Sequence, residues 1–197
     1  MPVTHHPSAW DDPATRHAWT RLVTCAALGQ FFWPLAWAAL LAWYVSMSET
    51  WTLWLFFVPM AYTFYRTFLQ VAYWREAFRA RSLLRRYPWQ RYNAPESGIG
   101  NIPGVRSGCA WLRFPLPDAP DQQVTMTMHS HVRSVWWGGR LGKRAKPERK
   151  AQVQEIWFAG DPRMAAVIAV PGPRRLYVLH QRPSYSPGIP GGVVKDS

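Results

Sequence analysis

The sequence predicts an α+β membrane protein, in which a hairpin of two transmembrane helices precedes a small antiparallel β-rich domain of about five strands. Two long apolar runs near the N-terminus predict the hairpin, and short alternating stretches between prolines and glycines predict the sheet. The composition agrees, because 48% of the 197 residues are hydrophobic and 17% are charged, against roughly 25% charged residues in soluble domains. These values exclude a disordered chain and a charge-rich coiled coil.

The first apolar run, Leu22 to Ser48, holds 27 residues without a charge. As a helix it would extend over roughly 40 Å, which exceeds the hydrocarbon core of about 30 Å. A second run begins at Thr50 and continues past Arg66 to Trp74. Arg66 would lie about 24 Å along that helix, so we expect its guanidinium to extend to the headgroups at the far interface. The short link predicts an antiparallel hairpin with helices at about 22–47 and 51–74.

The distribution of positive charge predicts the orientation of this hairpin. Arg16 and Arg21 precede the first helix and six arginines lie within residues 75–91, whereas the link carries Glu49 and neither Lys nor Arg. Cytoplasmic flanks carry the excess of Lys and Arg in membrane proteins. We therefore expect a two-span protein of the cell membrane with both termini in the cytoplasm.

The basic stretch that follows the second span holds six arginines against Glu76 alone. Its pattern predicts a juxtamembrane helix that stops at Pro88, since the residue before a proline avoids the helical conformation. Arginines beside a membrane attract anionic headgroups, and we expect such contacts from Arg79, Arg85 and Arg86. An alternative is that this stretch only fixes the topology, and the two interpretations are compatible.

Composition and periodicity divide the whole chain into six parts. The predicted parts are an N-terminal cytoplasmic segment (1–18), the transmembrane hairpin (19–74), the basic juxtamembrane helix (75–91), a linker rich in Pro, Gly and Ser (92–108), the cytoplasmic β domain (109–182) and a flexible tail (183–197). Alternating stretches predict strands at 109–114, 123–132, 153–158, 165–170 and 175–180. They predict a small antiparallel sheet or a partly open barrel.

A strongly basic segment, residues 138–150, follows two adjacent tryptophans and contains six basic residues and Glu148. It is predicted to be a long loop. Three interpretations remain open: contact with anionic lipid through tryptophan anchors, nucleic-acid binding through phosphates and stacked bases, or a solvated loop. The tether to a membrane raises the local concentration of lipid, which favours the first. The predicted contact residues are Trp136, Trp137, Arg140, Lys143, Arg144, Lys146, Arg149 and Lys150.

The sequence contains no pattern typical of catalysis, a cofactor or a metal centre. The acidic residues are scattered, no Gly-x-Ser-x-Gly motif occurs, and His129 with His131 supply only two potential zinc ligands. We therefore expect a non-enzymatic scaffold or accessory subunit. Its hairpin would bind a protein partner or a second copy, and its basic β domain would contact the inner leaflet or a protein partner. The alternative is a membrane-tethered nucleic-acid-binding protein that uses loop 138–150, since residues 92–197 carry 14 Lys and Arg against 7 Asp and Glu.

Two short motifs carry a resemblance to known proteins. YPWQ, Tyr87 to Gln90, follows the hairpin, and WFAGDPR, Trp157 to Arg163, precedes an apolar strand and a Pro-Gly turn. In these features the chain resembles a group of uncharacterised actinobacterial integral membrane proteins, over roughly residues 20–182. The resemblance implies a transmembrane hairpin with a cytoplasmic β-rich part, and it implies no catalytic residue, ligand or cofactor. The basic segment 138–150 departs from that pattern.

Overall fold

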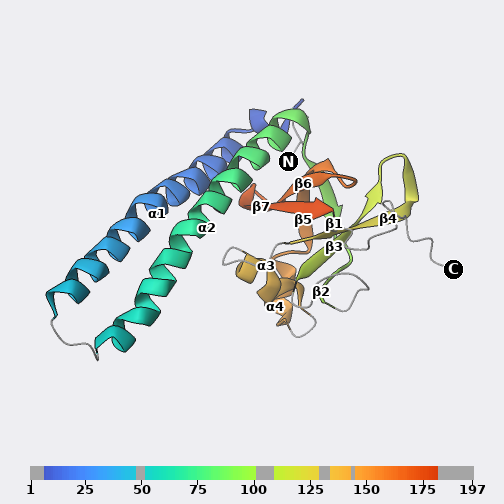
Figure 1. The fold of residues 1–197 in the computed structure, drawn as a ribbon. Helices are drawn as coiled ribbons and strands as arrows, with labels where there is room; N and C mark the ends of the chain where they lie inside the picture. Colours follow the sequence, from blue (N-terminus) through green and yellow to red (C-terminus); the bar gives the residue numbers. More distant parts are fainter. Residues whose placement is uncertain (1–6, 48–51, 101–108, 129–133, 143–144, 182–197) are drawn as a thin grey trace, which may run out of the picture. The chain divides into compact units, whose positions relative to one another are not determined.

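The computed structural model in Figure 1 describes residues 7–47, 52–100, 109–128, 134–142 and 145–181. The chain forms two compact units. The first, called the hairpin, is Trp19–Arg79; the second, called the β unit, combines Met1–Ala18 with Ala80–Ser197. Long helices and an antiparallel sheet together confirm the predicted α+β class.

The two long helices extend further than the apolar runs that predicted them. Helix α1 covers Pro13–Ser46 and helix α2 covers Thr52–Arg86. Helix α1 begins early because Asp12 caps it: the carboxylate accepts the backbone N–H groups of Ala14 and Thr15 at 3.1 and 3.2 Å. Helix α2 joins the second predicted span to the predicted basic helix without a break, and it ends two residues before Pro88.

Aromatic side chains make contacts between the two helices of the hairpin. The rings of Trp43 and Phe56 pack edge to face with their centroids 5.1 Å apart, and those of Trp33 and Tyr62 at 5.7 Å. Such pairs contribute about 0.5–1.5 kcal/mol beyond the area they bury. The contacts place late residues of α1 beside early residues of α2, as an antiparallel pair requires.

The helices approach closely at Gly29, and Arg66 lies near this contact. A Cβ atom at Gly29 would lie 2.7 Å from the side chain of Gln70, which is buried. One turn along, the guanidinium carbon of Arg66 lies 4.7 Å from the ring centroid of Trp33. Arg66 therefore lies opposite the middle of the uncharged run of α1. The prediction that its guanidinium extends to the headgroups came from a count along α2 alone, and it stays a prediction.

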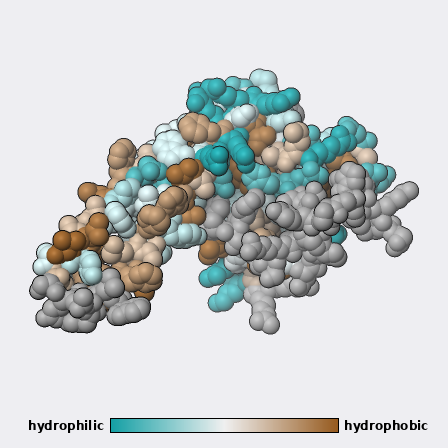
Figure 2. Space-filling model, viewed as in Figure 1, coloured by the Kyte–Doolittle hydropathy of each residue, from teal (hydrophilic) through white to brown (hydrophobic). Residues whose placement is uncertain are grey.

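On the face of the hairpin that Figure 2 presents, brown atoms lie among paler ones. Large apolar side chains are exposed on both helices. They are Leu28, Phe31, Phe32, Leu35, Trp43 and Val45 on α1, and Leu55, Phe57, Val58, Phe64 and Phe68 on α2. Within the described residues, one helix, α1, is long and apolar enough to cross a membrane. Helix α2 is long enough, but its mean hydropathy is lower, because it contains Arg66 and is rich in tyrosine, tryptophan and threonine.

Seven antiparallel strands form one curled sheet in the β unit (Figure 1). They are β1 (Gln90–Asn93), β2 (Ser97–Ile99), β3 (Ala110–Leu116), β4 (Ala119–Thr127), β5 (Glu155–Asp161), β6 (Ala165–Val170) and β7 (Arg174–Gln181), in the spatial order β1-β5-β6-β7-β4-β3-β2. The predicted number was about five. The two additional strands, β1 and β2, lie at the sheet edges and overlap the predicted linker 92–108. They escape the sequence pattern because they are short and lack apolar alternation.

Two helices occupy much of the segment 138–150, which was predicted to be one long loop. Helix α3 covers Ser134–Leu141 and helix α4 covers Pro147–Ala151. Trp137 and Leu141, one helical turn apart, are buried in the core with Phe114 and Phe158. Their burial stabilises α3 despite the two glycines inside it, which lower intrinsic helix propensity. Residues 143–144, 129–133 and the predicted tail 183–197 lie outside the described residues.

The N-terminal segment belongs to the β unit and does not form a separate part. Within it, a single turn of 3-10 helix, η1 (Ala9–Asp11), precedes α1. The backbone N–H of Ala9 donates to the carbonyl of Tyr87 at 2.9 Å. The indole Nε1–H of Trp89 donates to Oγ1 of Thr15 at 2.9 Å, and Thr15 is fully buried. The start of α1 is thereby joined to the segment that leads from α2 into β1.

Candidate functional site

One of the predicted basic residues, Arg140, contacts Trp136 of α3, whose ring is partly buried against the core. Arg140 follows Trp136 by one helical turn, and its guanidinium carbon lies 3.8 Å from the ring centroid of Trp136. Its Nη1 also donates to the Trp136 carbonyl at 3.0 Å, and its Nε donates to Oε1 of Gln152 at 2.8 Å. From β7, the guanidinium carbon of Arg175 lies 5.5 Å from the same ring. We call Trp136, Arg140, Arg149 and Arg175 the α3 cluster.

Positive charge is concentrated in the α3 cluster. Partial burial lowers the pKa of the Arg140 guanidinium, and the charges of Arg149 and Arg175 lower it further. Arginine still remains protonated at neutral pH. The cluster therefore holds three like charges near one another, and a bound anion would reduce their repulsion. This electrostatic arrangement is typical of a surface that receives phosphate-bearing ligands.

Arg175 is a member of the cluster that the sequence analysis did not identify. Its backbone has a φ of 59°, and the register between β6 and β7 shifts between Ile168 and Val170. The extra residue makes a β-bulge, which redirects a side chain relative to the regular strand. The pair Arg174–Arg175 directly after a Pro-Gly-Pro turn is the one sequence signal that could have indicated it.

The remaining predicted contact residues fall in several places. Trp137 is buried in the core at 1% exposure, so its ring is enclosed by protein. Lys146, Arg149 and Lys150 are exposed in or beside α4, and Arg79, Arg85 and Arg86 are exposed on the last two turns of α2. Lys143 and Arg144 lie outside the described residues. The two adjacent tryptophans therefore differ: Trp137 lies inside the core, and Trp136 is partly buried against it.

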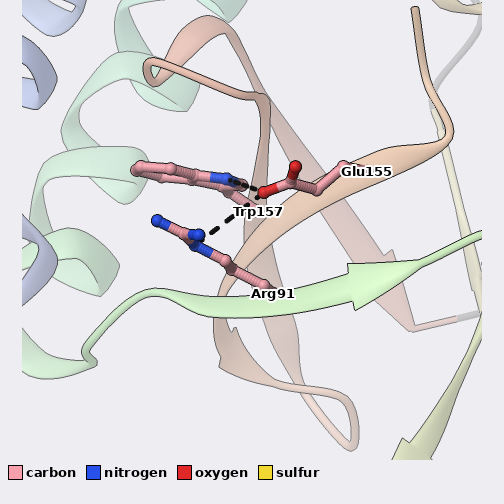
Figure 3. Close-up of polar contacts among 3 residues, drawn as sticks. All are labelled: Arg91, Glu155 and Trp157. Atoms are coloured by element: carbon pink, nitrogen blue, oxygen red, sulfur yellow. Dashed lines mark hydrogen bonds and ion pairs between the residues drawn. The ribbon is translucent and has the colours of Figure 1, made fainter. Parts of the chain in front are cut away.

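A second group of arginine and tryptophan lies on β1 and β5 at the edge of the sheet (Figure 3). Arg91 and Trp157 are register partners, and the guanidinium carbon lies 4.9 Å from the ring centroid. Glu155 lies two residues from Trp157 on the same face; its Oε1 accepts the indole N–H at 2.8 Å and lies 3.8 Å from Nε of Arg91. The ring of Trp89 packs against Trp157 with centroids 5.9 Å apart. The two motifs that carried the resemblance are thus in contact, through Trp89 and Trp157.

The ion pair of this edge, Arg91–Glu155, contributes little to stability. Side chains of Arg91 and Glu155 are 47% and 38% exposed, and an exposed pair contributes about 0–1 kcal/mol. The indole hydrogen bond and the stacked guanidinium fix the three side chains more firmly than charge alone.

Trp10 lies near two further arginines, Arg81 and Arg85, each with its guanidinium carbon 5.4 Å from the ring centroid.

The described residues include no group of three or more His, Cys, Asp or Glu side chains that could hold a metal. His129 and His131 lie outside the described residues, so their predicted shared face is not placed. Among the described acids, Glu96 pairs with Arg113 at 2.9 Å and Asp118 with Arg163 at 2.8 Å.

The chain matches no family model, no curated protein and no solved structure. The resemblance to actinobacterial membrane proteins therefore stays a prediction. Function has to be argued from the exposed apolar helices and from the α3 cluster.

Proposed function

We propose that the chain is a non-enzymatic integral membrane protein, a scaffold or accessory subunit with two spans and both termini in the cytoplasm. The observation that carries this proposal is the exposure of large apolar side chains on both helices of the hairpin, with Phe31 at 78% and Val58 at 70%. Burying one such side chain is worth about 1.5–3 kcal/mol. Covering both faces with lipid or with partner helices removes that apolar surface from water.

The case for a second span rests on the pairing of the helices. A span formed by α1 alone would require α2 to remain in water with Leu55, Val58 and Phe68 exposed. Antiparallel pairing with α1 instead carries α2 back across the bilayer. Its tyrosines and tryptophans lower the mean hydropathy of the helix because each carries a polar group. Their amphipathic rings are nevertheless favoured at membrane interfaces. The arginines of residues 75–91 would then lie at the cytoplasmic headgroups.

The first test is the topology of the hairpin. In a background without native cysteines (Cys25→Ser, Cys109→Ser), we expect a membrane-impermeant maleimide to label Ser48→Cys in right-side-out vesicles. The matched variant Gly139→Cys, exposed in α3, should label only after permeabilisation. Labelling of both variants in sealed vesicles would show that α2 does not return across the membrane.

For the β unit, we propose contact with the anionic inner leaflet through the α3 cluster. Its guanidinium groups suit phosphate headgroups, and an indole beside them suits the interfacial region. Nucleic-acid binding is the weaker alternative for a specific reason. Arg140 already lies over the ring of Trp136 and Trp137 is buried, which leaves little indole surface for stacked bases.

Hydrogen exchange of the full chain in nanodiscs tests this contact. We expect α3 and α4 to exchange severalfold more slowly with phosphatidylglycerol than with phosphatidylcholine alone, because each nearby positive charge contributes about 1 kcal/mol. The difference should disappear at about 0.5 M salt, where the screening length falls to a few ångströms. The variant Arg140→Gln/Arg149→Gln/Arg175→Gln should also remove it.

The control for that experiment is Arg163→Gln. Arg163 lies in the β5–β6 turn, is exposed and pairs with Asp118. It is not a member of the α3 cluster, so its loss should leave the lipid effect unchanged. Equal exchange of α3 and α4 in the two lipids would contradict the lipid contact. Slower exchange caused by added single-stranded DNA in phosphatidylcholine nanodiscs would favour the nucleic-acid alternative.

A further inference from the structure

Within residues 22–46 of α1 and 52–74 of α2, Arg66 is the single Asp, Glu, Lys or Arg side chain. Its guanidinium carbon lies 4.7 Å from the ring centroid of Trp33 and 5.9 Å from that of Tyr62. Its Nε atom is buried without a hydrogen-bond acceptor. Within the described residues, Arg66 has aromatic neighbours but no carboxylate at ion-pair distance.

The pairing of the helices determines how deep Arg66 would lie, given the two-span membrane topology proposed above, on which this inference rests. Trp33 follows Arg21 by twelve residues and precedes Ser46 by thirteen, so about 18–20 Å of helix extend on each side of it. Arg66 lies beside Trp33 and is therefore close to the middle of the bilayer. An arginine side chain extends roughly 6 Å from its Cα atom, too little to reach headgroups about 15 Å away.

A stripe of exposed apolar side chains continues toward Arg66 along α2. Leu55, Val58 and Tyr62 follow one another at intervals of three and four residues, with exposures of 67%, 70% and 50%. Arg66 is four residues after Tyr62, and it is partly exposed. These intervals place all four on one face of the helix. A helix that packs along this stripe would meet the guanidinium.

We propose that Arg66 is the recognition point for a partner transmembrane helix that carries an aspartate or glutamate at mid-span. Ionisable groups in membranes are costly and pair with one another, and a carboxylate accepts two guanidinium hydrogen bonds at once. A second copy of this chain does not provide that carboxylate, because Glu49, in the link, is the one acid of residues 22–74. A lipid phosphate lies too far from this depth.

The test uses a probe of known chemistry: a synthetic leucine-rich transmembrane helix with one aspartate at its centre. Fluorescence transfer between this peptide and the full chain in phosphatidylcholine vesicles measures association. We expect the aspartate peptide to associate roughly five- to thirtyfold more strongly than an otherwise identical peptide with leucine at that position. Moving the aspartate by two helical turns should remove most of the preference.

Variants of the chain assign the preference to Arg66. Arg66→Gln should abolish it, and Arg66→Lys should keep part of it, because the charge remains while the bidentate geometry is lost. The matched control is Arg75→Gln, which removes an exposed arginine of α2 outside the predicted span and should leave the preference unchanged.

The topology of the same variants separates this inference from the proposed function. Maleimide labelling that shows α2 outside the bilayer would overturn both. A confirmed two-span topology with equal association of the aspartate and leucine peptides would overturn only the role of Arg66. A third outcome is that the parent chain shows no preference for the aspartate peptide, and that Arg66→Gln binds less phosphatidylglycerol than the parent chain. That outcome would show that Arg66 reaches the headgroups, and it would also overturn the proposed role of Arg66.

Discussion

Replacing Trp137 by alanine should destabilise the β unit by about 3–5 kcal/mol, the range for removing a large aromatic side chain from a packed core. Trp137 is 1% exposed and lies in the core cluster with Phe114, Phe158 and Leu141. Its loss leaves a cavity between α3 and the sheet that these neighbours fill only in part. Small domains have about 5–15 kcal/mol of total stability, so the variant would lose a large fraction of it.

Pulse proteolysis of the detergent-solubilised full chain at increasing urea concentration measures this change. With a urea dependence of about 1–3 kcal/mol per molar, the unfolding midpoint should fall by roughly 2 M. The matched control is Val135→Ala on the exposed side of the same helix, where Val135 is 70% exposed; its midpoint should stay within about 0.3 M. Equal midpoints for the two variants would contradict the assignment of Trp137 to the core.

Gly160→Ala should be the second severe change, with a loss of about 3 kcal/mol or more. Gly160 has a φ of 150°, which residues with a Cβ atom rarely adopt. A Cβ atom there would lie 2.5 Å from the carbonyl oxygen of Ala165 and 2.5 Å from Cα of Ala166, on the neighbouring strand β6. Both atoms belong to backbone, so relief requires β5 and β6 to separate.

Hydrogen exchange of the β5 and β6 amides should therefore accelerate by two orders of magnitude or more in Gly160→Ala. Gly139→Ala is the matched control, and we expect it to raise the stability of the β unit, whereas Gly160→Ala lowers it. No atom lies within 4 Å of a Cβ added at Gly139, and alanine in a helix interior gains up to about 1 kcal/mol over glycine. Unchanged exchange in β5 and β6 would show that the strands tolerate a side chain at position 160.

The elements predicted correctly from the sequence are those with strong local signals. Strand β6, Ala165–Val170, has its predicted bounds because an apolar run lies between two turns rich in proline and glycine. Strand β1 was missed, since Gln-Arg-Tyr-Asn has no apolar alternation and its structure depends on pairing with β5, more than 60 residues later. Edge strands of this kind are determined by long-range contacts that periodicity does not contain.

The candidate site was predictable only in part for a similar reason. The sequence indicated Trp136, Trp137 and Arg140 together, but which of two adjacent tryptophans is fully buried cannot be decided until the helix phase is known. Arg175 joins them through a bulge in β7, which no local pattern marks. The contact of Arg66 with Trp33 likewise depends on the pairing of two helices and is not encoded in either one.

The hydrogen bonds from Ala9 to Tyr87 and from Trp89 to Thr15 make the β unit discontinuous along the chain. A fragment that starts at residue 80 would lose the Thr15 acceptor and the Ala9 donor, so no uninterrupted piece without the hairpin reproduces the folded unit. The same arrangement determines the order in which the two parts of the β unit are synthesised. The first eighteen residues emerge before the hairpin, whose 61 residues (19–79) take roughly 3–12 s to synthesise. The N-terminal segment is therefore synthesised before the residues that it contacts in the β unit. In a stalled or truncated chain it would lack those partners.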